Sequence, residues 1–254
     1  MIPTNITSIL ESYVSKLKEN TEIIGVFLVG SYATGQFSEH SDIDIKIILN
    51  SNVSKRYKGV KICNGYHISY TAYPVTEAYD YFYSQLRSYS KFQARMLSQG
   101  IILHDVTGEM KHLKEEAILV MQLPFIKHPL KSLQLQAYSL WKYKDALLQD
   151  NLGIFTLKEF HVFLEKSLIL YTKLLGVECI FQYPFFKMEN YISNVSFREK
   201  YNIPKFPDES FLDMYVKGIT LTVADDIKNT ARSIFNVIET KLQIDFEQFE
   251  IVSS

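Results

Sequence analysis

The segment Gly25 to Ile48 reads GVFLVGSYATGQFSEHSDIDIKII: an apolar run ends in a Gly-Ser pair, a polar loop follows, and two aspartates, Asp42 and Asp44, then alternate with isoleucines. Side chains at positions i and i+2 of a strand lie on the same face, so Asp42 and Asp44 point one way and Ile43 points the other. Two adjacent negative charges are unfavourable unless a cation lies between them. The pair therefore predicts a strand with one apolar face and one face that binds a cation.

The residues that precede this strand suggest which ligand binds together with the cation. An apolar run, Ile23 to Val29, ends in Gly30 and Ser31, and a polar spacer then leads to Asp42. A glycine at a strand end allows a phosphate to approach the backbone closely, and the serine hydroxyl and nearby amides can hold its oxygens. If the two strands are neighbours, the carboxylates face these donors, which suits Mg²⁺ bound to a polyphosphate. The chemistry expected there is in-line transfer at phosphorus.

The combination of Gly-Ser after an apolar strand, a spacer and Asp-x-Asp resembles the signature of the nucleotidyltransferase superfamily typified by DNA polymerase β. The stretch GSYATGQFSEHSDIDI is most similar to small bacterial antibiotic nucleotidyltransferases of the kanamycin and lincosamide type. The resemblance covers about the first 117 residues and implies that Asp42 and Asp44 are catalytic and ligate Mg²⁺. It also implies that Gly30 and Ser31 bind the phosphates of a nucleoside triphosphate, expected to be ATP. The implied product is a nucleoside monophosphate ester on a hydroxyl of a small-molecule acceptor, with an antibiotic as one candidate.

The sequence departs from this family pattern at one position. The superfamily usually has a third acid on a later strand, often as the base that deprotonates the acceptor, and the corresponding position here is Ser69. Three explanations remain open. His67 acts as the base, or a carboxylate of the helical region such as Glu159 or Glu165 reaches the site, or the protein binds a nucleotide or a partner without turnover.

Hydrophobic periodicity predicts an α+β fold with two domains. We expect a nucleotidyltransferase domain at residues 1–117, with a mixed sheet flanked by helices, and an all-α helical bundle at residues 118–254. Asn64-Gly65 predicts a type I′ turn between two strands of a hairpin, because both turn positions require positive φ. The predicted strands are 23–29, 42–49, 57–63, 66–73 and 101–105, and the longer predicted helices are 76–97, 107–122, 130–149, 156–176, 207–219 and 222–242.

Charge and composition limit the partners. The chain has 27 Lys and Arg against 28 Asp and Glu, which gives a formal net charge of −1 and no bulk positive field for a long nucleic acid. A small-molecule acceptor is therefore expected rather than tRNA or DNA. Arg87, Lys91 and Arg95 share a helical i, i+4, i+8 spacing that suggests either a triphosphate contact or a solvated face.

The remaining features point to a cytoplasmic protein without a membrane segment. No apolar run reaches the roughly 18 residues of a spanning helix, and the first residues lack the pattern of a signal peptide. Cys63 and Cys179 form neither a disulfide framework nor a metal motif. A homodimer is compatible with the sequence. Beside the enzyme hypothesis, two alternatives remain: a catalytically degenerate nucleotide-binding or partner-binding module, and an enzyme that modifies a macromolecule.

Overall fold

A computed structural model describes residues 2–149, 153, 156–179 and 188–250, and it divides into two compact units. The first unit comprises Met1–Pro124 together with Glu189–Ile203, and the second comprises Phe125–Met188 together with Pro204–Ser254. A short segment from the second half of the sequence, Glu189–Ile203, thus belongs to the first unit. The predicted division into domains at 117 and 118 remains a prediction.

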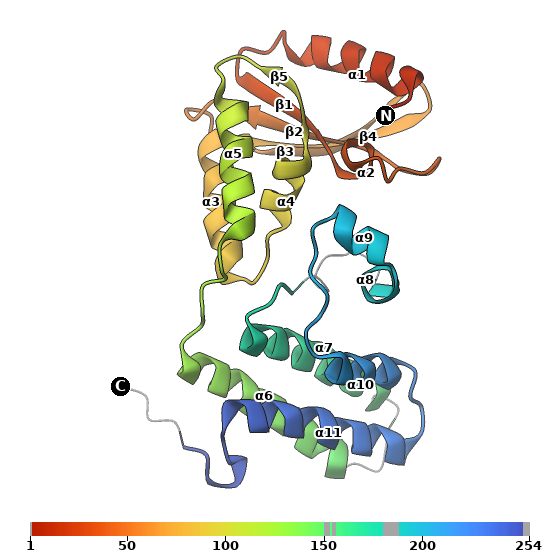
Figure 1. Cartoon of the computed structure of the whole chain (residues 1–254), viewed down its shortest axis with the longest axis vertical. Helices are drawn as coiled ribbons and strands as arrows, with labels where there is room; N and C mark the ends of the chain where they lie inside the picture. Colours follow the sequence, from red (N-terminus) through yellow and green to blue (C-terminus); the bar gives the residue numbers. More distant parts are fainter. Residues whose placement is uncertain (1, 150–152, 154–155, 180–187, 251–254) are drawn as a thin grey trace. The chain divides into compact units, whose positions relative to one another are not determined.

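The first unit is built on a mixed five-stranded sheet, which confirms the predicted α+β class (Figure 1). The strand order is β3-β4-β2-β1-β5, with β2 and β4 parallel and the other neighbouring pairs antiparallel. The Asn64-Gly65 turn joins β3 to β4 with φ angles of 51° and 82°, as the hairpin prediction requires. The strands are β1 (Ile23–Val29), β2 (Ile43–Leu49), β3 (Tyr57–Cys63), β4 (Tyr66–Pro74) and β5 (Ile101–Asp105).

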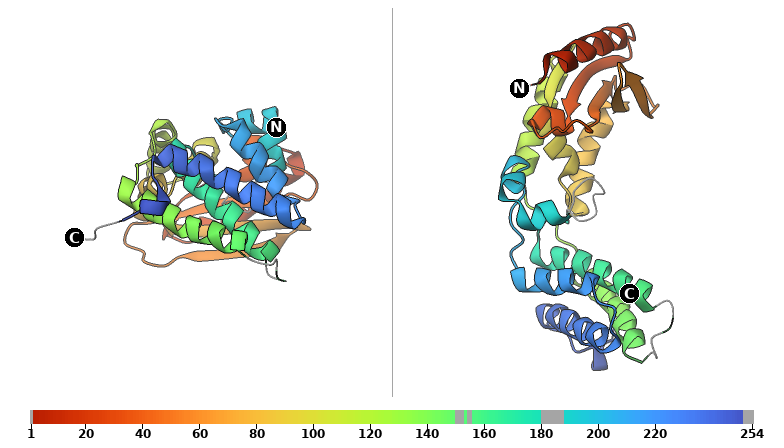
Figure 2. Two further views of the ribbon diagram at one scale, coloured as in Figure 1. Left: turned by 90° about the horizontal axis from the view of Figure 1, so that it is seen from below. Right: turned by 90° about the vertical axis from the view of Figure 1, so that its right-hand side faces the viewer.

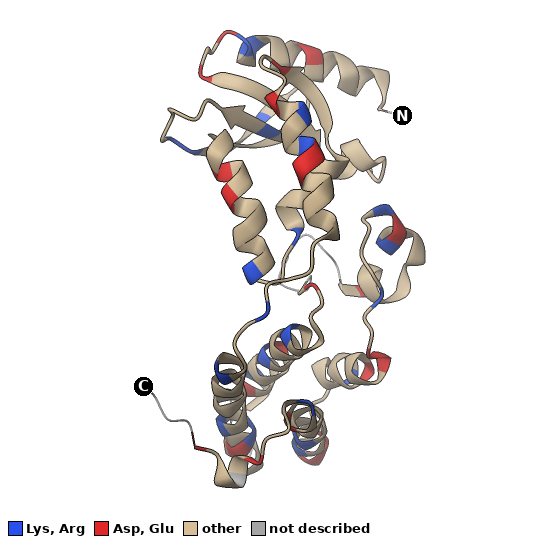
Figure 3. Ribbon diagram, turned by 60° about the vertical axis from the view of Figure 1, so that its left-hand side comes forward, with Lys and Arg blue, Asp and Glu red and all other residues tan. Residues whose placement is uncertain are grey.

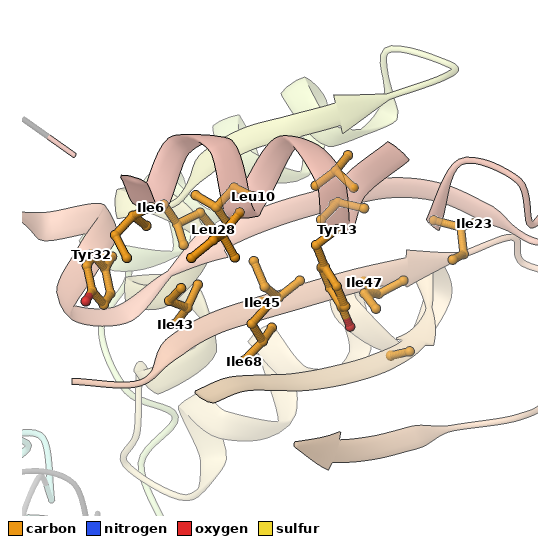
Figure 4. Packing of buried hydrophobic residues seen from close by; sticks show 14 of the residues in the cluster. Ile6, Leu10, Tyr13, Ile23, Leu28, Tyr32, Ile43, Ile45, Ile47 and Ile68 are labelled. Carbon is orange, nitrogen blue, oxygen red and sulfur yellow. The ribbon is translucent and has the colours of Figure 1, made fainter. Parts of the chain in front are cut away.

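Helices cover both faces of this sheet (Figures 1 and 2). Helix α1 lies on one face, where its apolar side packs on isoleucines of β2 and on Leu28 of β1 (Figure 4). Helices α3, α4 and α5 lie on the opposite face. The helices of this unit are α1 (Thr4–Leu17), α2 (Gly30–Thr34), α3 (Val75–Arg87), α4 (Phe92–Gln99), α5 (Glu109–Gln122), α8 (Met188–Ser193, from Glu189 onward) and α9 (Val195–Lys200).

The second unit is helical in its described residues, as predicted for this part of the chain. Four long helices pack on one another around the buried aromatic rings of Phe160, Phe163, Phe211 and Phe235. They are α6 (Leu130–Gln149), α7 (Thr156–Leu175), α10 (Glu209–Ile219) and α11 (Ala224–Leu242), followed by the 3₁₀ turn η2 (Phe246–Gln248). None of the helices in the described part of the chain has the length and apolar character needed to cross a bilayer.

Three segments differ from the sequence prediction. The polar spacer after β1 begins with the short helix α2, and the proline-broken segment before residue 204 contains α8 and α9. The predicted helix at 76–97 is two helices, because Tyr89 adopts a positive φ of 57° and buries its ring to 1% exposure. Burial of that ring in the core outweighs the helical spacing of its neighbours.

Lys and Arg are interspersed with Asp and Glu over both units (Figure 3).

Candidate active site

The two aspartates lie at the start of β2, which runs between β1 and β4: Asp42 precedes the strand and Asp44 is its second residue. Asp44 pairs with Val29 at the end of β1 and with Ser69 on β4. Ile43 is fully buried on the face under α1, whereas Asp44 lies on the other face. The predicted alternation of Ile43 and Asp44 between the two faces is therefore confirmed, and cation binding on the second face remains a prediction.

Gly30 brings the chain directly against the second aspartate. Its φ of +68° lies in the left-handed region, and a Cβ placed there would lie 2.4 Å from Asp44 Oδ2. Only a residue without a side chain allows both this turn and this close approach. Ser31 follows in the first turn of α2, and its hydroxyl has no hydrogen-bond partner in the described part of the chain. The structure thus brings Gly30 and Ser31 together with the acidic pair.

Two further residues of the same motif, Tyr32 and Thr34, make contacts that stabilise the local fold. Tyr32 is 4% exposed and stacks on Phe37, with ring centroids 4.7 Å apart. The hydroxyl of Thr34 donates to the carbonyl oxygens of Gly30 and Ser31, at 3.2 Å each. These contacts fix the path of α2 and leave the first turn next to Asp44.

Burial and repulsion define the electrostatics of the acidic pair. Burial and, secondarily, the Asp42 carboxylate raise the pKa of Asp44 to about 6, against the opposing effect of Lys46. Lys46 lies on the same face one pleat further along β2, and its ammonium donates to Thr71 Oγ1 at 2.7 Å. Burial lowers the pKa of Lys46 to about 8, with Asp44 acting against this shift and Lys58 adding to it.

We expect binding of a divalent cation to the Asp42–Asp44 pair to weaken as the pH falls through about 6. Below this pH the carboxyl of Asp44 holds a proton in the folded, metal-free protein, and a cation must displace it. The affinity should then fall up to about tenfold per pH unit. Titration with Mn²⁺, followed by electron paramagnetic resonance at about pH 5 and about pH 7.5, measures this, and equal affinities at the two values would contradict it.

Two β4 side chains complete the acidic face. Ser69 Oγ donates to Asp42 Oδ2 at 3.3 Å, and His67 Nδ1 lies 3.6 Å from Asp42 Oδ1. Ser69, the residue expected at the place of the usual third acid, is thus in contact with Asp42 through its hydroxyl. Glu159 and Glu165, the other candidates for a base, lie on α7 in the second unit.

The donor set suits a hard cation that keeps part of its shell for other ligands. Two carboxylates lie together next to a glycine corner, and burial, with a smaller contribution from the Asp42 carboxylate, raises the pKa of Asp44. No cluster of three or more His, Cys, Asp and Glu side chains forms a metal cage within the described residues. Mg²⁺ is commonly held by one or two carboxylates and completed by water and phosphate oxygens, so these residues fit that ion.

The predicted basic face does not form. Arg87 ends α3, whereas Lys91 follows that helix and Arg95 belongs to α4, so the three residues do not share one helix. The Lys91 ammonium donates to the carbonyl oxygens of Met121 and Leu123. Arg95 is 2% exposed and therefore inaccessible to a triphosphate. The helical spacing was a misleading signal because the chain turns at Tyr89.

Arg95 instead anchors the segment that returns from the second half of the sequence. Its Nε donates to the carbonyl oxygen of Tyr201 at 2.8 Å, and Gln99 Nε2 donates to the carbonyl oxygen of Lys200 at 2.7 Å. The Tyr201 hydroxyl lies 3.5 Å from Thr34 Oγ1 on α2. Arg95 and Tyr201 are separated by 106 positions in the sequence, and Thr34 and Tyr201 by 167. No local sequence pattern could indicate these contacts.

The sheet order, the glycine corner and the paired acids define a nucleotidyltransferase fold in the first unit. Residues 10–119 match the family model described as "Nucleotidyltransferase domain". Among solved structures, the chain is similar to a nucleotidyltransferase-like protein from Exiguobacterium sibiricum 255-15, with 11% identity and a TM-score of 0.50. That match covers 94% of this chain and 74% of the other, and at this identity it shows the fold alone. No curated protein matches the sequence.

Proposed function

We propose that the chain is a Mg²⁺-dependent nucleotidyltransferase that moves AMP from ATP onto a hydroxyl of a small-molecule acceptor. An antibiotic is one candidate acceptor, in line with the resemblance to the kanamycin and lincosamide enzymes. The observation that carries the proposal is the contact between the Gly30 corner and the carboxylate of Asp44. This contact supports the proposal because a glycine backbone can accept a phosphate closely and two neighbouring carboxylates can hold a divalent cation.

In the proposed reaction the acceptor oxygen attacks the α-phosphorus, and the bond from that phosphorus to the bridging oxygen breaks. Pyrophosphate leaves with the bonding electrons, while the hydroxyl proton passes to a base. His67 is the proposed base, since it lies beside Asp42 on the strand next to β2. A bound Mg²⁺ would stabilise the charge that develops on the transferring phosphate. Gly30 and Ser31 would orient the leaving phosphates.

A second candidate function is nucleotide binding without turnover. The observation in its favour is the hydrogen bond from Ser69, the residue expected at the place of the third acid, to Asp42. A serine hydroxyl is a poor base near neutral pH, so the site would have lost the group that activates the acceptor. In that case a nucleotide would still bind at the glycine corner.

The two functions are separated by an assay of pyrophosphate release from labelled nucleoside triphosphates with Mg²⁺ and a panel of aminoglycosides and lincosamides. The proposed enzyme releases pyrophosphate only when its acceptor is present and prefers ATP. Asp42→Asn should reduce this release on the order of 100-fold or more. Unchanged release in that variant contradicts the assignment of the site. Calorimetric ATP binding with no release across the panel favours the second candidate.

A further inference from the structure

The strands of the first unit arrange the site residues in successive columns across one face of the sheet. The register places Val60 of β3 beside Ser69 of β4, and Ser69 beside Asp44 of β2. One pleat further toward the end of β3, Ile62 lies beside His67, which contacts Asp42. Moving inward from the β3 edge, this face therefore carries an apolar column, a polar column and the acidic pair, with the Gly30 corner beyond.

The apolar column consists of Val60 and Ile62 of the edge strand, and Lys58 shares its face. Val60 and Ile62 are 60% and 70% exposed on the side of the sheet opposite α1. On the face that α1 covers, the same strand carries Tyr57, Gly59, Lys61 and Cys63, and the Lys61 ammonium lies 5.7 Å from the centre of the Tyr13 ring. A strand with one covered face normally turns its branched apolar residues toward that face. Exposing two of them beside the site is unfavourable unless a ligand covers them.

The geometry of in-line transfer indicates which ligand approaches the site from the β3 side of the sheet. The entering oxygen and the leaving oxygen lie on opposite sides of the phosphorus. If pyrophosphate leaves on the β1 side at Gly30, as the proposed reaction has it, and the line of transfer runs across the strands, the acceptor enters on the β4 and β3 side. Neighbouring strands are about 4.8 Å apart, so the apolar column lies about 10 Å from the acidic column. That distance is within the length of a small molecule.

We propose that Val60 and Ile62 form an apolar wall of the acceptor site. The acceptor then carries an alkyl or aromatic surface about 10 Å or less from its reacting hydroxyl. The inference rests on the proposed transfer reaction and narrows its substrate class. It favours a hydroxyl compound with an apolar arm over a wholly polar polyol or polycation of similar size.

Methyl NMR of the full chain tests the wall with a matched pair of probes, octyl β-D-glucoside below its micellar concentration and methyl β-D-glucoside. Both are added to protein that holds Mg²⁺ and α,β-methylene ATP. The octyl compound is expected to shift the Val60 and Ile62 methyl signals, and the methyl compound is not. Ile62→Thr should weaken binding of the octyl compound about tenfold. Val106→Thr is the control, because Val106 is 61% exposed and follows β5 at the opposite edge of the sheet.

Each other outcome overturns the proposal. If the ATP analogue binds but the octyl compound leaves Val60 and Ile62 unshifted, or binds Ile62→Thr equally well, the wall is wrong while the transfer reaction stands. If Ile62→Thr changes only the mass measured by light scattering, the column is a contact between copies of the chain. If the ATP analogue does not bind, the proposed function fails and the acceptor wall fails with it.

Discussion

Replacing Asp44 by asparagine is expected to abolish nucleotidyl transfer and to stabilise the metal-free protein. The carboxylate loses its charge at the position closest to Gly30, so turnover should fall on the order of 1,000-fold. Stability changes in the opposite direction because the pKa of Asp44 in the folded chain is about 6, well above its ordinary value of 3.8. The folded protein therefore binds this proton more tightly than the unfolded chain does.

The sign and pH range of this stability effect follow from proton linkage. Between about pH 4 and about pH 6 the folded wild-type protein gives up a proton that the unfolded chain has already lost, so its free energy of unfolding falls with rising pH. Asparagine stays neutral, which should raise the free energy of unfolding by about 1–2 kcal/mol at about pH 8. At about pH 4 the difference should vanish.

Urea unfolding with EDTA at both pH values measures the stability effect. Asp80→Asn is the matched control, because Asp80 lies exposed on α3 and should affect neither stability nor turnover beyond a few tenths of a kcal/mol. Mg²⁺ should stabilise the wild-type protein but not Asp44→Asn. A variant that is less stable than the wild type at high pH would show that burial does not dominate the environment of Asp44.

Replacing Gly30 by alanine is the second large effect that we expect. The new Cβ would overlap Asp44 Oδ2 at 2.4 Å, and it would also place a non-glycine residue at a φ of +68°. The backbone strain should lower the free energy of unfolding by about 1–2 kcal/mol. Because the carboxylate must rotate away to make room, turnover and metal affinity should fall much further, on the order of 100-fold.

Gly108→Ala separates the overlap from the strain. Gly108 has a φ of +79°, and a Cβ there meets nothing within 4 Å. The two variants should therefore lose similar stability in thermal or urea unfolding, while only Gly30→Ala loses turnover and Mn²⁺ affinity. Equal losses of activity in the two variants would mean that the close approach of Gly30 to Asp44 has no functional consequence.

Much of the first unit was predictable because its signals are local. Alternation around Asp42 and Asp44, the glycine after β1 and the Asn64-Gly65 turn each specify backbone geometry within a few residues. The strands themselves were predicted to within a residue or two, and the hairpin has the positive φ angles that its turn requires.

What could not be predicted depends on residues that are distant in sequence. Buried Tyr89 divides a helical pattern in two, and Arg95, whose spacing suggested a solvated or phosphate-binding face, has its guanidinium in the interior. Lys46 was also missed, since its position on the acidic face matters only once Thr71 lies beside it. These are effects of tertiary burial that override local propensity. The roles of Gly30, Ser31, Asp42 and Asp44 remain predictions.

The return of Glu189–Ile203 to the first unit bears on how the polypeptide is made. When the nascent chain has emerged from the ribosome as far as Pro124, every strand of the sheet has been synthesised. The carbonyl oxygen that accepts the hydrogen bond from Arg95, however, belongs to Tyr201. Until some eighty further residues have emerged, the hydrogen bond from Arg95 to Tyr201 cannot form. The contacts of α4 with Lys200 and Tyr201 can therefore form only late in translation, after most of the helical second half has been synthesised.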